Sequence, residues 1–172
     1  MNPVADGLAP RPAFAVIDAT ILHIFISPGH NFRGRHGREP GNYEAIEVET
    51  ARCVAGKGIE GDRYFEYEDD YKGQITLFDW HVYRAVCDAV GVHDQSVSVL
   101  RRNVITAGFD LNDFVGKRFE IQGIQFEGAE ECKPCRWMDR AFAPGAYAAL
   151  EGRGGLRARI LTSGILQRSF QA

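Results

Sequence analysis

The chain has 172 residues, of which 45% are hydrophobic and 25% charged, and its formal net charge is -3 at pH 7. This length favours one domain with a sizeable buried core, and the negative charge argues against a general nucleic-acid binder. The apolar segment 14–26 is interrupted by Asp18 and His23 and is too short to span a bilayer, so no membrane partner is predicted.

The cysteines indicate a reducing compartment. No apolar stretch follows a basic start at the beginning of the chain, so a secretory signal is not expected. We therefore expect the cysteines to be reduced thiols in the cytosol. They are Cys53, Cys87, Cys132 and Cys135.

Charge is unevenly distributed along the chain. Residues 44–70 contain nine acidic and three basic residues, whereas residues 133–159 contain six basic and two acidic residues. A basic region on an acidic protein suits a small anionic ligand better than a polymer, although a solvated basic surface has the same pattern.

The first elements in chain order are a loose tail, a strand and a loop. Residues 1–12 are predicted to be a loose tail preceding one domain over 13–172. Residues 19–27 are rich in β-formers and end at Pro-Gly, which predicts a buried strand. Residues 28–42 contain four glycines and two prolines and are predicted to be a basic loop. Four of its basic residues form a cluster in the sequence, Arg33, Arg35, His36 and Arg38.

The middle of the chain is predicted to hold two strands and the clearest helix. Residues 43–54 alternate as a strand does, residues 55–73 indicate a long exposed loop, and residues 74–78 a short strand. Asp79 is typical of a helix N-cap, and Gly91 of a helix stop.

The last third is again rich in predicted strands. Residues 96–106 are strand-like with a break at 101–103, and residues 117–127 have the pattern of a hairpin that turns at Gln-Gly. Residues 156–162 are expected to form a further strand. Short helical turns are expected at 136–142 and 145–150. The fold class predicted is therefore mainly β, a closed or nearly closed β-barrel with a few peripheral helices.

The sequence Cys132-Lys133-Pro134-Cys135 carries the clearest chemistry. A zinc site needs two further ligands at close spacing, and a thioredoxin-like exchanger needs a strand–helix context that is missing here. The third interpretation is a reactive thiolate, because Lys133 and Arg136 flank Cys135 and cationic neighbours favour the thiolate. Two buried thiols that serve only as small apolar groups remain an alternative.

Three further segments combine glycine or polar residues with arginine. Residues 56–64 contain alternate glycines that can form an anion nest, residues 101–108 contain two arginines and an asparagine, and residues 152–159 combine glycines with three arginines. Each segment alone also fits a purely structural role, as a tight loop, a charged edge strand or a turn with solvated arginines.

Taken in order, these segments resemble the MOSC family, the domain found at the C-terminus of molybdenum cofactor sulfurases. The resemblance runs from Ile21 to Gly164 and depends on five motifs. They are residues 58–63, Arg101-Arg102-Asn103 with Thr106 and Gly108, residues 111–119, residues 132–135 and residues 152–159.

The resemblance implies a β-rich barrel that binds the molybdenum cofactor (molybdopterin), an anionic pterin. The family's key cysteine matches Cys135, which it implies is the catalytic thiolate, either as molybdenum ligand or as persulfide carrier; Cys132 matches a less essential position. The cofactor phosphate is expected near Arg101 and the 152–157 loop. The residues implied to bind the cofactor are Lys57, Asp62, Arg63, Arg101, Arg102, Asn103, Thr106, Arg153 and Arg157.

The resemblance also implies an external partner. The chain has neither a pyridoxal-phosphate desulfurase domain nor a cysteine cluster for an iron–sulfur centre. A sulfur donor such as a cysteine desulfurase, or an electron-transfer protein that supports reduction of N-hydroxylated compounds, is therefore expected. Whether the chain is itself an oxidoreductase or a sulfur transferase stays open. The alternatives are a non-catalytic cofactor-binding or chaperone module and a dithiol redox protein.

Overall fold

The strands account for most of the regular structure. The structure is a computed structural model that describes residues 14–33 and 37–169; the tail predicted at 1–12 lies outside the described residues, as do Arg35 and His36 of the basic loop. The strands are β1 Ala15–Val16, β2 Thr20–Ile26, β3 Ile46–Glu47, β4 Thr50–Val54, β5 Gly58–Ile59, β6 Ile75–Asp79, β7 Val104–Ala107, β8 Arg118–Ile121, β9 Ile124–Glu131, β10 Leu156–Ile160 and β11 Gly164–Gln167.

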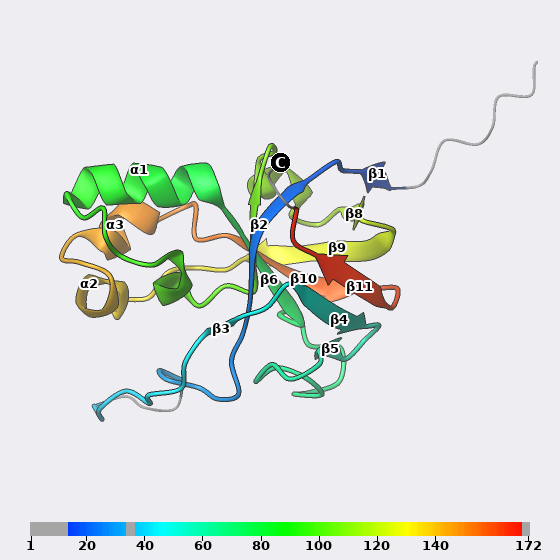
Figure 1. Ribbon diagram of the computed structural model, residues 1–172, viewed down its shortest axis with the longest axis horizontal. Coiled ribbons are helices and arrows are strands. Elements are labelled where there is room, and N and C mark those ends of the chain that lie inside the picture. Colours follow the sequence, from blue (N-terminus) through cyan, green and yellow to red (C-terminus); the bar gives the residue numbers. More distant parts are fainter. Residues whose placement is uncertain (1–13, 34–36, 170–172) are drawn as a thin grey trace, which may run out of the picture.

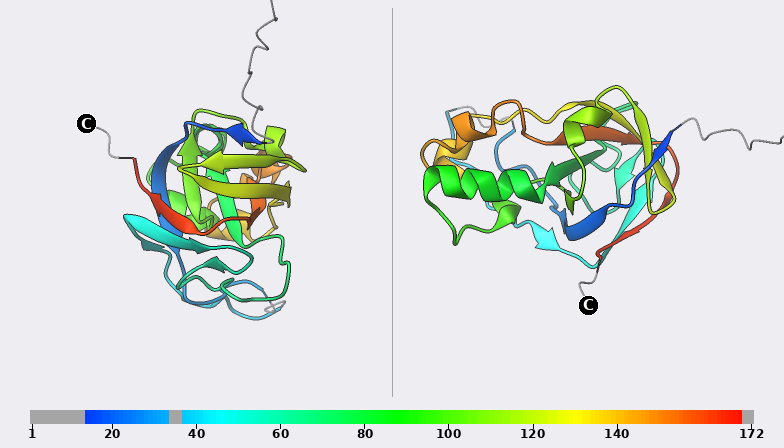
Figure 2. Two further views of the ribbon diagram at one scale, coloured as in Figure 1. Left: turned by 90° about the vertical axis from the view of Figure 1, so that its right-hand side faces the viewer. Right: turned by 90° about the horizontal axis from the view of Figure 1, so that it is seen from above.

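The strands form two sheets that curl around one interior (Figure 2). The larger sheet has the order β1-β8-β9-β10-β6-β7-β2-β3, and the smaller has the order β11-β4-β5. Most neighbours are antiparallel, but β6 pairs with β7, and β1 with β8, in parallel. The mainly β, nearly closed barrel predicted from the sequence is confirmed.

Alternating apolar side chains fill the barrel. On β2, Ile21 and Ile24 are fully buried, and they pack with β8 and β9 residues such as Phe119 and Phe126. The predicted hairpin is β8–β9, whose turn at Gln122-Gly123 has φ values of 51° and 78°. Two consecutive residues with positive φ match the twist of the flanking strands, which explains the glycine there.

The helices gather beside the barrel, on the left of Figure 1. Helix α1 spans Trp80–Val90; the Asp79 carboxylate accepts from the backbone N–H of His81 at 2.7 Å, and Gly91 ends the helix with a φ of 69°. The predicted N-cap at Asp79 and the predicted helix stop at Gly91 are therefore confirmed. The predicted turns are α2, Met138–Ala141, and α3, Ala146–Leu150. These helices share a second core cluster with β6.

The strand predicted over 96–106 is wrong in its first half. Residues Val97–Leu100 form a 3-10 helix, η1, because the Ser96 hydroxyl caps the backbone N–H of Ser98. Arg101 then takes a φ of 54° and reverses the chain before β7. A second 3-10 helix, η2, spans Leu111–Phe114.

Two other boundaries differ from the predictions. The strand predicted over 43–54 is divided between β3 and β4, which pair with different sheets. The loop predicted over 55–73 is not exposed throughout, because β5 pairs with β4 and places Ile59 in the core. Strand β11, which also pairs with β4, had no predicted counterpart. Among the described residues, no helix has the length and hydropathy needed to cross a membrane.

Candidate functional site

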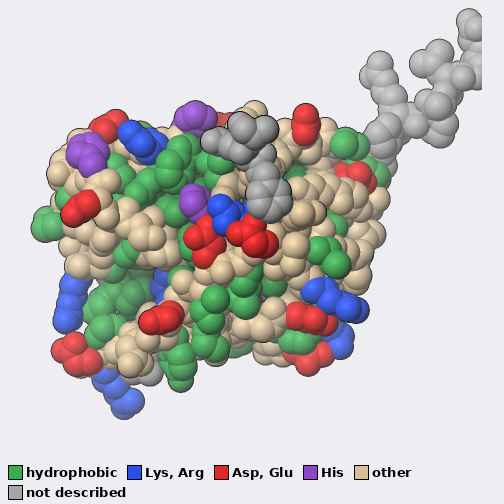
Figure 3. Space-filling model, viewed as in Figure 1, with side chains coloured by type: hydrophobic (Ala, Val, Ile, Leu, Met, Phe, Trp, Pro, Cys, Tyr) green, Lys and Arg blue, Asp and Glu red, His purple; other side chains and the backbone are tan. Residues whose placement is uncertain are grey.

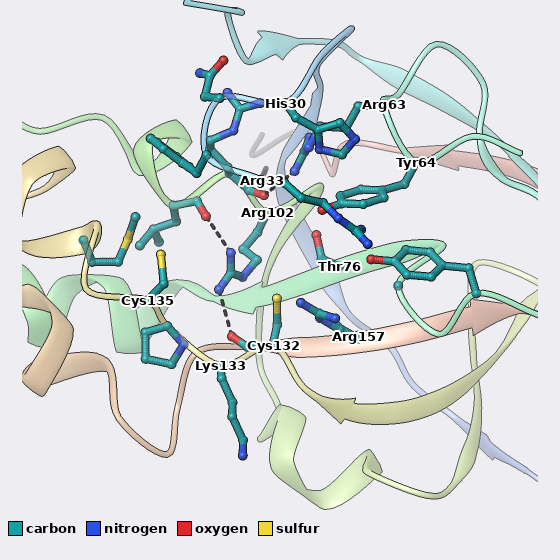
Figure 4. A pocket seen from close by; sticks show the side chains of 18 residues that line it. His30, Arg33, Arg63, Tyr64, Thr76, Arg102, Cys132, Lys133, Cys135 and Arg157 are labelled. Carbon is teal, nitrogen blue, oxygen red and sulfur yellow. Dashed lines mark hydrogen bonds between the residues drawn. The ribbon is translucent and has the colours of Figure 1, made fainter. Parts of the chain in front are cut away.

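A pocket of about 520 Å³ opens where loops from the barrel meet the segment leading into α2 (Figure 4). The β2–β3 loop and the loop after β5 form one wall, the loop wall. The segments after η1 and β9, with β10, form the other, the thiol wall. The lining includes His30, Asn31, Phe32, Arg33, Arg63, Tyr64, Tyr71, Gly73, Thr76, Leu100, Arg101, Arg102, Cys132, Lys133, Pro134, Cys135, Met138 and Arg157.

Positive charge dominates this lining. Six of the described lining residues are cationic, and the described lining contains no Asp or Glu. The six are Arg33, Arg63, Arg101, Arg102, Lys133 and Arg157. By contrast, Lys and Arg alternate with Asp and Glu over the face shown in Figure 3. Cations crowded in a concave site attract an anion of low molecular weight.

Arg101 holds the β2–β3 loop against the barrel. Its Nη1 donates to the carbonyl of Tyr43 at 3.0 Å, and its Nη2 donates to Ser27 Oγ and the Gly29 carbonyl at 2.9 and 2.8 Å. Burial, and then the neighbouring charge of Arg63, lower the pKa of Arg101 to about 10. Arg101 therefore both orients a wall and contributes charge to the pocket.

Asp62 supports the same wall from behind. Its buried carboxylate accepts from the backbone N–H groups of Ser27 and Tyr64 at 3.0 and 3.2 Å, and from Arg63 Nη1 at 3.2 Å. Arg63 Nη2 donates to the carbonyl of Arg101. Asp62 is not part of the lining, so the structure places it as the anchor of Arg63 and of the loop.

Arg102 holds the opposite wall, which contains the thiols. Its Nε donates to the carbonyl of Gly154 at 2.9 Å, its Nη1 to Leu100 at 2.8 Å and its Nη2 to Cys132 at 2.9 Å (Figure 4). The backbone N–H of Cys132 also donates to Gly155 at 2.7 Å. One guanidinium thereby joins the segment after η1 to two segments far away in the chain, at Cys132 and Gly154.

The glycines of the 152–159 motif have a packing role. A Cβ on Gly154 would overlap the carbonyl oxygen of Cys132 and crowd Pro134. A Cβ on Gly155 would overlap the Leu77 carbonyl, and its φ of 96° also favours glycine. These glycines let β10 approach the thiol segment closely.

The two thiols of the pocket have different exposures. Cys135 is exposed, whereas Cys132 is only 6% exposed and lies beside the guanidinium of Arg157. Burial lowers the pKa of Arg157, but the neighbouring side chains of Cys132, Tyr71 and Glu130 together raise that pKa overall. Arg157 also contacts Glu130, at 3.4 Å. Cations next to a thiol favour its thiolate, the form that acts as nucleophile and metal ligand.

The other two cysteines lie in the hydrophobic clusters. Cys53 is fully buried in the barrel core, and burial raises the pKa of its thiol to about 12. Cys87 is buried in the second cluster, on α1. Both are placed as small apolar groups, in contrast to the thiols of the pocket.

Aromatic side chains that were not among the predicted site residues line the loop wall. Tyr64 stacks on Tyr71 with ring centroids 5.2 Å apart, and the guanidinium of Arg63 lies 4.9 Å from the Tyr64 ring. His30 meets Tyr64 edge-on at 4.8 Å. Burial, and then the charges of Arg63 and Arg33, lower the pKa of His30. The clustering of tyrosines after residues 58–63 was the available signal.

Asn103 and Thr106 lie in the interior rather than on the pocket. Asn103 Oδ1 accepts from the backbone N–H and Oγ1 of Thr76, at 3.0 and 2.9 Å, and its Nδ2 donates to the Phe25 carbonyl. Thr106 is fully buried, and its hydroxyl donates to the Phe78 carbonyl. Their hydrogen bonds join β2, β6 and β7 behind the pocket.

Lys57 and Arg153 also lie outside the lining. Lys57 forms an exposed ion pair with Glu66, and Arg153 Nε donates to the carbonyl of Ala149 at 2.8 Å. Of the site residues predicted from the sequence, the pocket lining therefore contains Cys135, Arg63, Arg101, Arg102 and Arg157. Among the described residues, no group of three or more His, Cys, Asp or Glu side chains is placed to hold a metal ion.

One comparison with known proteins identifies a family. The family model of the MOSC domain matches residues 62–168, more than half of the chain. No curated protein matches by sequence.

Solved structures show the same fold at low sequence identity. The YuaD protein from Bacillus subtilis has a TM-score of 0.69 and 17% identity, with 89% of this chain and 97% of that one covered. YiiM from Geobacillus stearothermophilus has a TM-score of 0.60 and 14% identity, with coverage of 87% and 71%. YiiM from Escherichia coli has a TM-score of 0.56 and 14% identity, with coverage of 82% and 65%.

Proposed function

Because this chain belongs to the MOSC domain family, we propose that its pocket binds the molybdenum cofactor, an anionic pterin, with the Cys135 thiolate directed toward the metal. One observation carries this proposal: six cationic side chains and no carboxylate among the described residues that line the pocket. A cofactor that ends in phosphate would relieve the mutual repulsion of these charges.

The residues present fit such a group. The volume of about 520 Å³ lies within the range of small-molecule sites, roughly 300–1,000 Å³. The exposed thiol of Cys135 supplies a soft ligand, which suits a metal that prefers sulfur. When bound, the cofactor would supply redox chemistry at its metal, and the chain would supply charge, orientation and one thiolate.

We place the phosphate between Arg101 and Arg157, with Arg157 as the main donor. Arg101 already uses three of its five N–H groups for Tyr43, Ser27 and Gly29. Arg102 is likewise committed to three carbonyls. Their contribution is therefore positive charge and positioning, and Arg157 has more freedom to form parallel hydrogen bonds with a phosphate.

A second form of the function is sulfur carriage. The observation that favours it is an exposed thiol, Cys135, beside a second thiol, Cys132, in the same pocket. An exposed thiol is accessible to a partner protein that delivers a sulfur atom. In either form the chain requires a partner, a sulfur donor or an electron-transfer protein.

The first experiment measures molybdenum and pterin in protein purified without oxygen from a host that makes the cofactor. Cys135→Ser is compared with wild type and with Cys87→Ala, which removes a buried thiol outside the pocket. We expect near-stoichiometric molybdenum in wild type and Cys87→Ala, and little in Cys135→Ser. Molybdenum absent from all three would contradict cofactor binding, and equal amounts in all three would contradict thiolate ligation.

The second experiment tests the phosphate placement. Arg157→Met is expected to weaken cofactor binding about tenfold to a hundredfold, the range for loss of a charge-assisted hydrogen bond. Arg153→Met is the matched variant, because its guanidinium bonds to Ala149 outside the lining. Equal losses in the two variants would show that the motif acts as a whole and that the placement is wrong.

A further inference from the structure

The buried thiol of Cys132 is a nucleophile that cofactor binding leaves unused. It lines the same pocket as Cys135, yet it is only 6% exposed. Its neighbour is the guanidinium of Arg157, which also contacts Glu130 at 3.4 Å. By contrast, the thiol of Cys53 packs among apolar residues in the barrel core.

The backbone of Cys132 is held firmly. Its carbonyl accepts from Arg102, and its N–H donates to Gly155. Cys135 follows three residues later, so the two Cα atoms lie no more than roughly 11 Å apart. Both sulfurs rise from this segment toward the interior of the pocket in Figure 4. A persulfide adds one S–S bond of about 2 Å to the reach of Cys135.

The surroundings separate the two thiols by access. A protein donor can approach the exposed Cys135, whereas Cys132 is buried and lines the pocket. Lys133 and Pro134 lie between them on the lining. The arrangement therefore has an outer thiol that can be loaded and an inner thiol that lies next to a fixed cation.

We propose that the two thiols form a persulfide relay, in which a sulfur atom loaded on Cys135 moves inward to Cys132. The Cys132 thiolate attacks the outer sulfur of the Cys135 persulfide and forms a new S–S bond to it. The bond between that sulfur and Cys135 Sγ breaks, and Cys135 leaves as a thiolate that takes up the proton released by Cys132. The oxidation level of the transferred sulfur is unchanged, so no oxidant or reductant is consumed.

Arg157 is the positioning residue of this step. Its guanidinium lies beside Cys132, where its positive charge would balance the negative charge that moves between the sulfur atoms during the transfer. The relay rests on the sulfur-carrying form of the proposed function. It adds a direction, from the exposed rim to the inner part of the pocket.

The test loads the full chain with a cysteine desulfurase, pyridoxal phosphate and L-cysteine, a donor too large to enter the pocket. Trypsin does not cleave Lys133-Pro134, so both thiols lie on the peptide that ends at Arg136, and fragment ions must assign the persulfide. In wild type we expect label first on Cys135 and then on Cys132. In Cys132→Ser the label should stay on Cys135, and in Cys135→Ser the label on Cys132 should fall more than tenfold.

Each outcome decides the proposal. Equal labelling of Cys132 in wild type and Cys135→Ser would overturn the relay, as would label that never leaves Cys135 in wild type. No label on either thiol would overturn the sulfur-carrying function itself, which is a different result from a failed hand-off.

A second pair of variants avoids substitution of the thiols. Arg157→Met should slow the transfer from Cys135 to Cys132 about tenfold relative to the loading of Cys135, which is measured in the same sample. Arg157→Lys should restore part of this relative rate because it keeps the charge. A merely structural role for Arg157 predicts instead that both steps change together, or that lysine gives no rescue.

Discussion

The two walls of the pocket are held by neighbouring residues of one motif but by different physical means. The loop wall, residues 27–33 and 63–73, is fixed by Arg101 and by the buried carboxylate of Asp62. The thiol wall, residues 132–138 and 154–157, is fixed by Arg102 through three carbonyl groups. Adjacent arginines thus orient opposite sides of one site.

The contrast shows two ways in which groups of the protein itself stabilise the cations of the pocket. The loop wall compensates Arg63 with the buried charge of Asp62, whereas the thiol wall has carbonyl dipoles against Arg102. The two walls meet where Phe32 contacts Trp137, with ring centroids 4.9 Å apart. Each wall and this junction can be broken separately.

Arg102→Met should have the largest effect. It removes three hydrogen bonds from a charged donor, so the free energy of unfolding, measured in urea, is expected to fall by about 3 kcal/mol. Alkylation of Cys132 by iodoacetamide should accelerate, since its segment is released. Arg118→Met is the control, because its exposed contact with Glu127 is worth less than about 1 kcal/mol. Equal losses would refute the special role of Arg102.

Asp62→Asn should come next and should affect the loop wall. The N–H groups of Ser27 and Tyr64 donate to different oxygens of the carboxylate, so an amide keeps only one of these two hydrogen bonds. The charge that balances Arg63 is also lost, and we expect about 2 kcal/mol of destabilisation. Cys132 alkylation should stay slow. The exposed Asp69, changed to Asn, is the comparison in the same urea titration; a Cys132 that reacts as fast as in Arg102→Met would contradict the separation of the walls.

Phe32→Ala should loosen the junction between the walls. An aromatic pair contributes about 1 kcal/mol beyond the area it buries, so the thermal midpoint is expected to fall by a few degrees. Phe32→Leu keeps part of the apolar contact and should lose less. An unchanged midpoint in the alanine variant would mean that the two walls are held independently.

His30 should give the smallest effect, visible in its titration. Its pKa is lowered by burial and by Arg63 and Arg33, so the unfolded chain takes up the proton first as the pH falls below about 6.5. The contribution of His30 to the free energy of unfolding is therefore complete above this pH and decreases as the pH falls toward the folded-state pKa. Arg33→Met should raise the pKa of His30, measured by NMR. An unchanged pKa would mean that the charge of Arg33 does not act on His30.

Local patterns in the sequence were sufficient for elements whose cause is local. Asp79 and Gly91 mark the ends of α1, and Gln122-Gly123 marks the β8–β9 turn, because a cap or a positive φ depends on a few consecutive residues. The η1 turn was missed because the capping by Ser96 competes with a β-like apolar pattern.

The candidate site shows the same distinction between features with a local cause and features that depend on distant residues. Residue patterns alone were sufficient to indicate the family, the thiol pair and the concentration of arginines in a few motifs. The folded chain was needed to show that Arg157 faces the pocket while Arg153 does not. It was also needed to show that Asn103 and Thr106 lie in the interior and that His30 joins the lining. The reason is that the partners of these side chains come from segments far away in the chain, and neither spacing nor composition encodes which carbonyl or ring a guanidinium will meet.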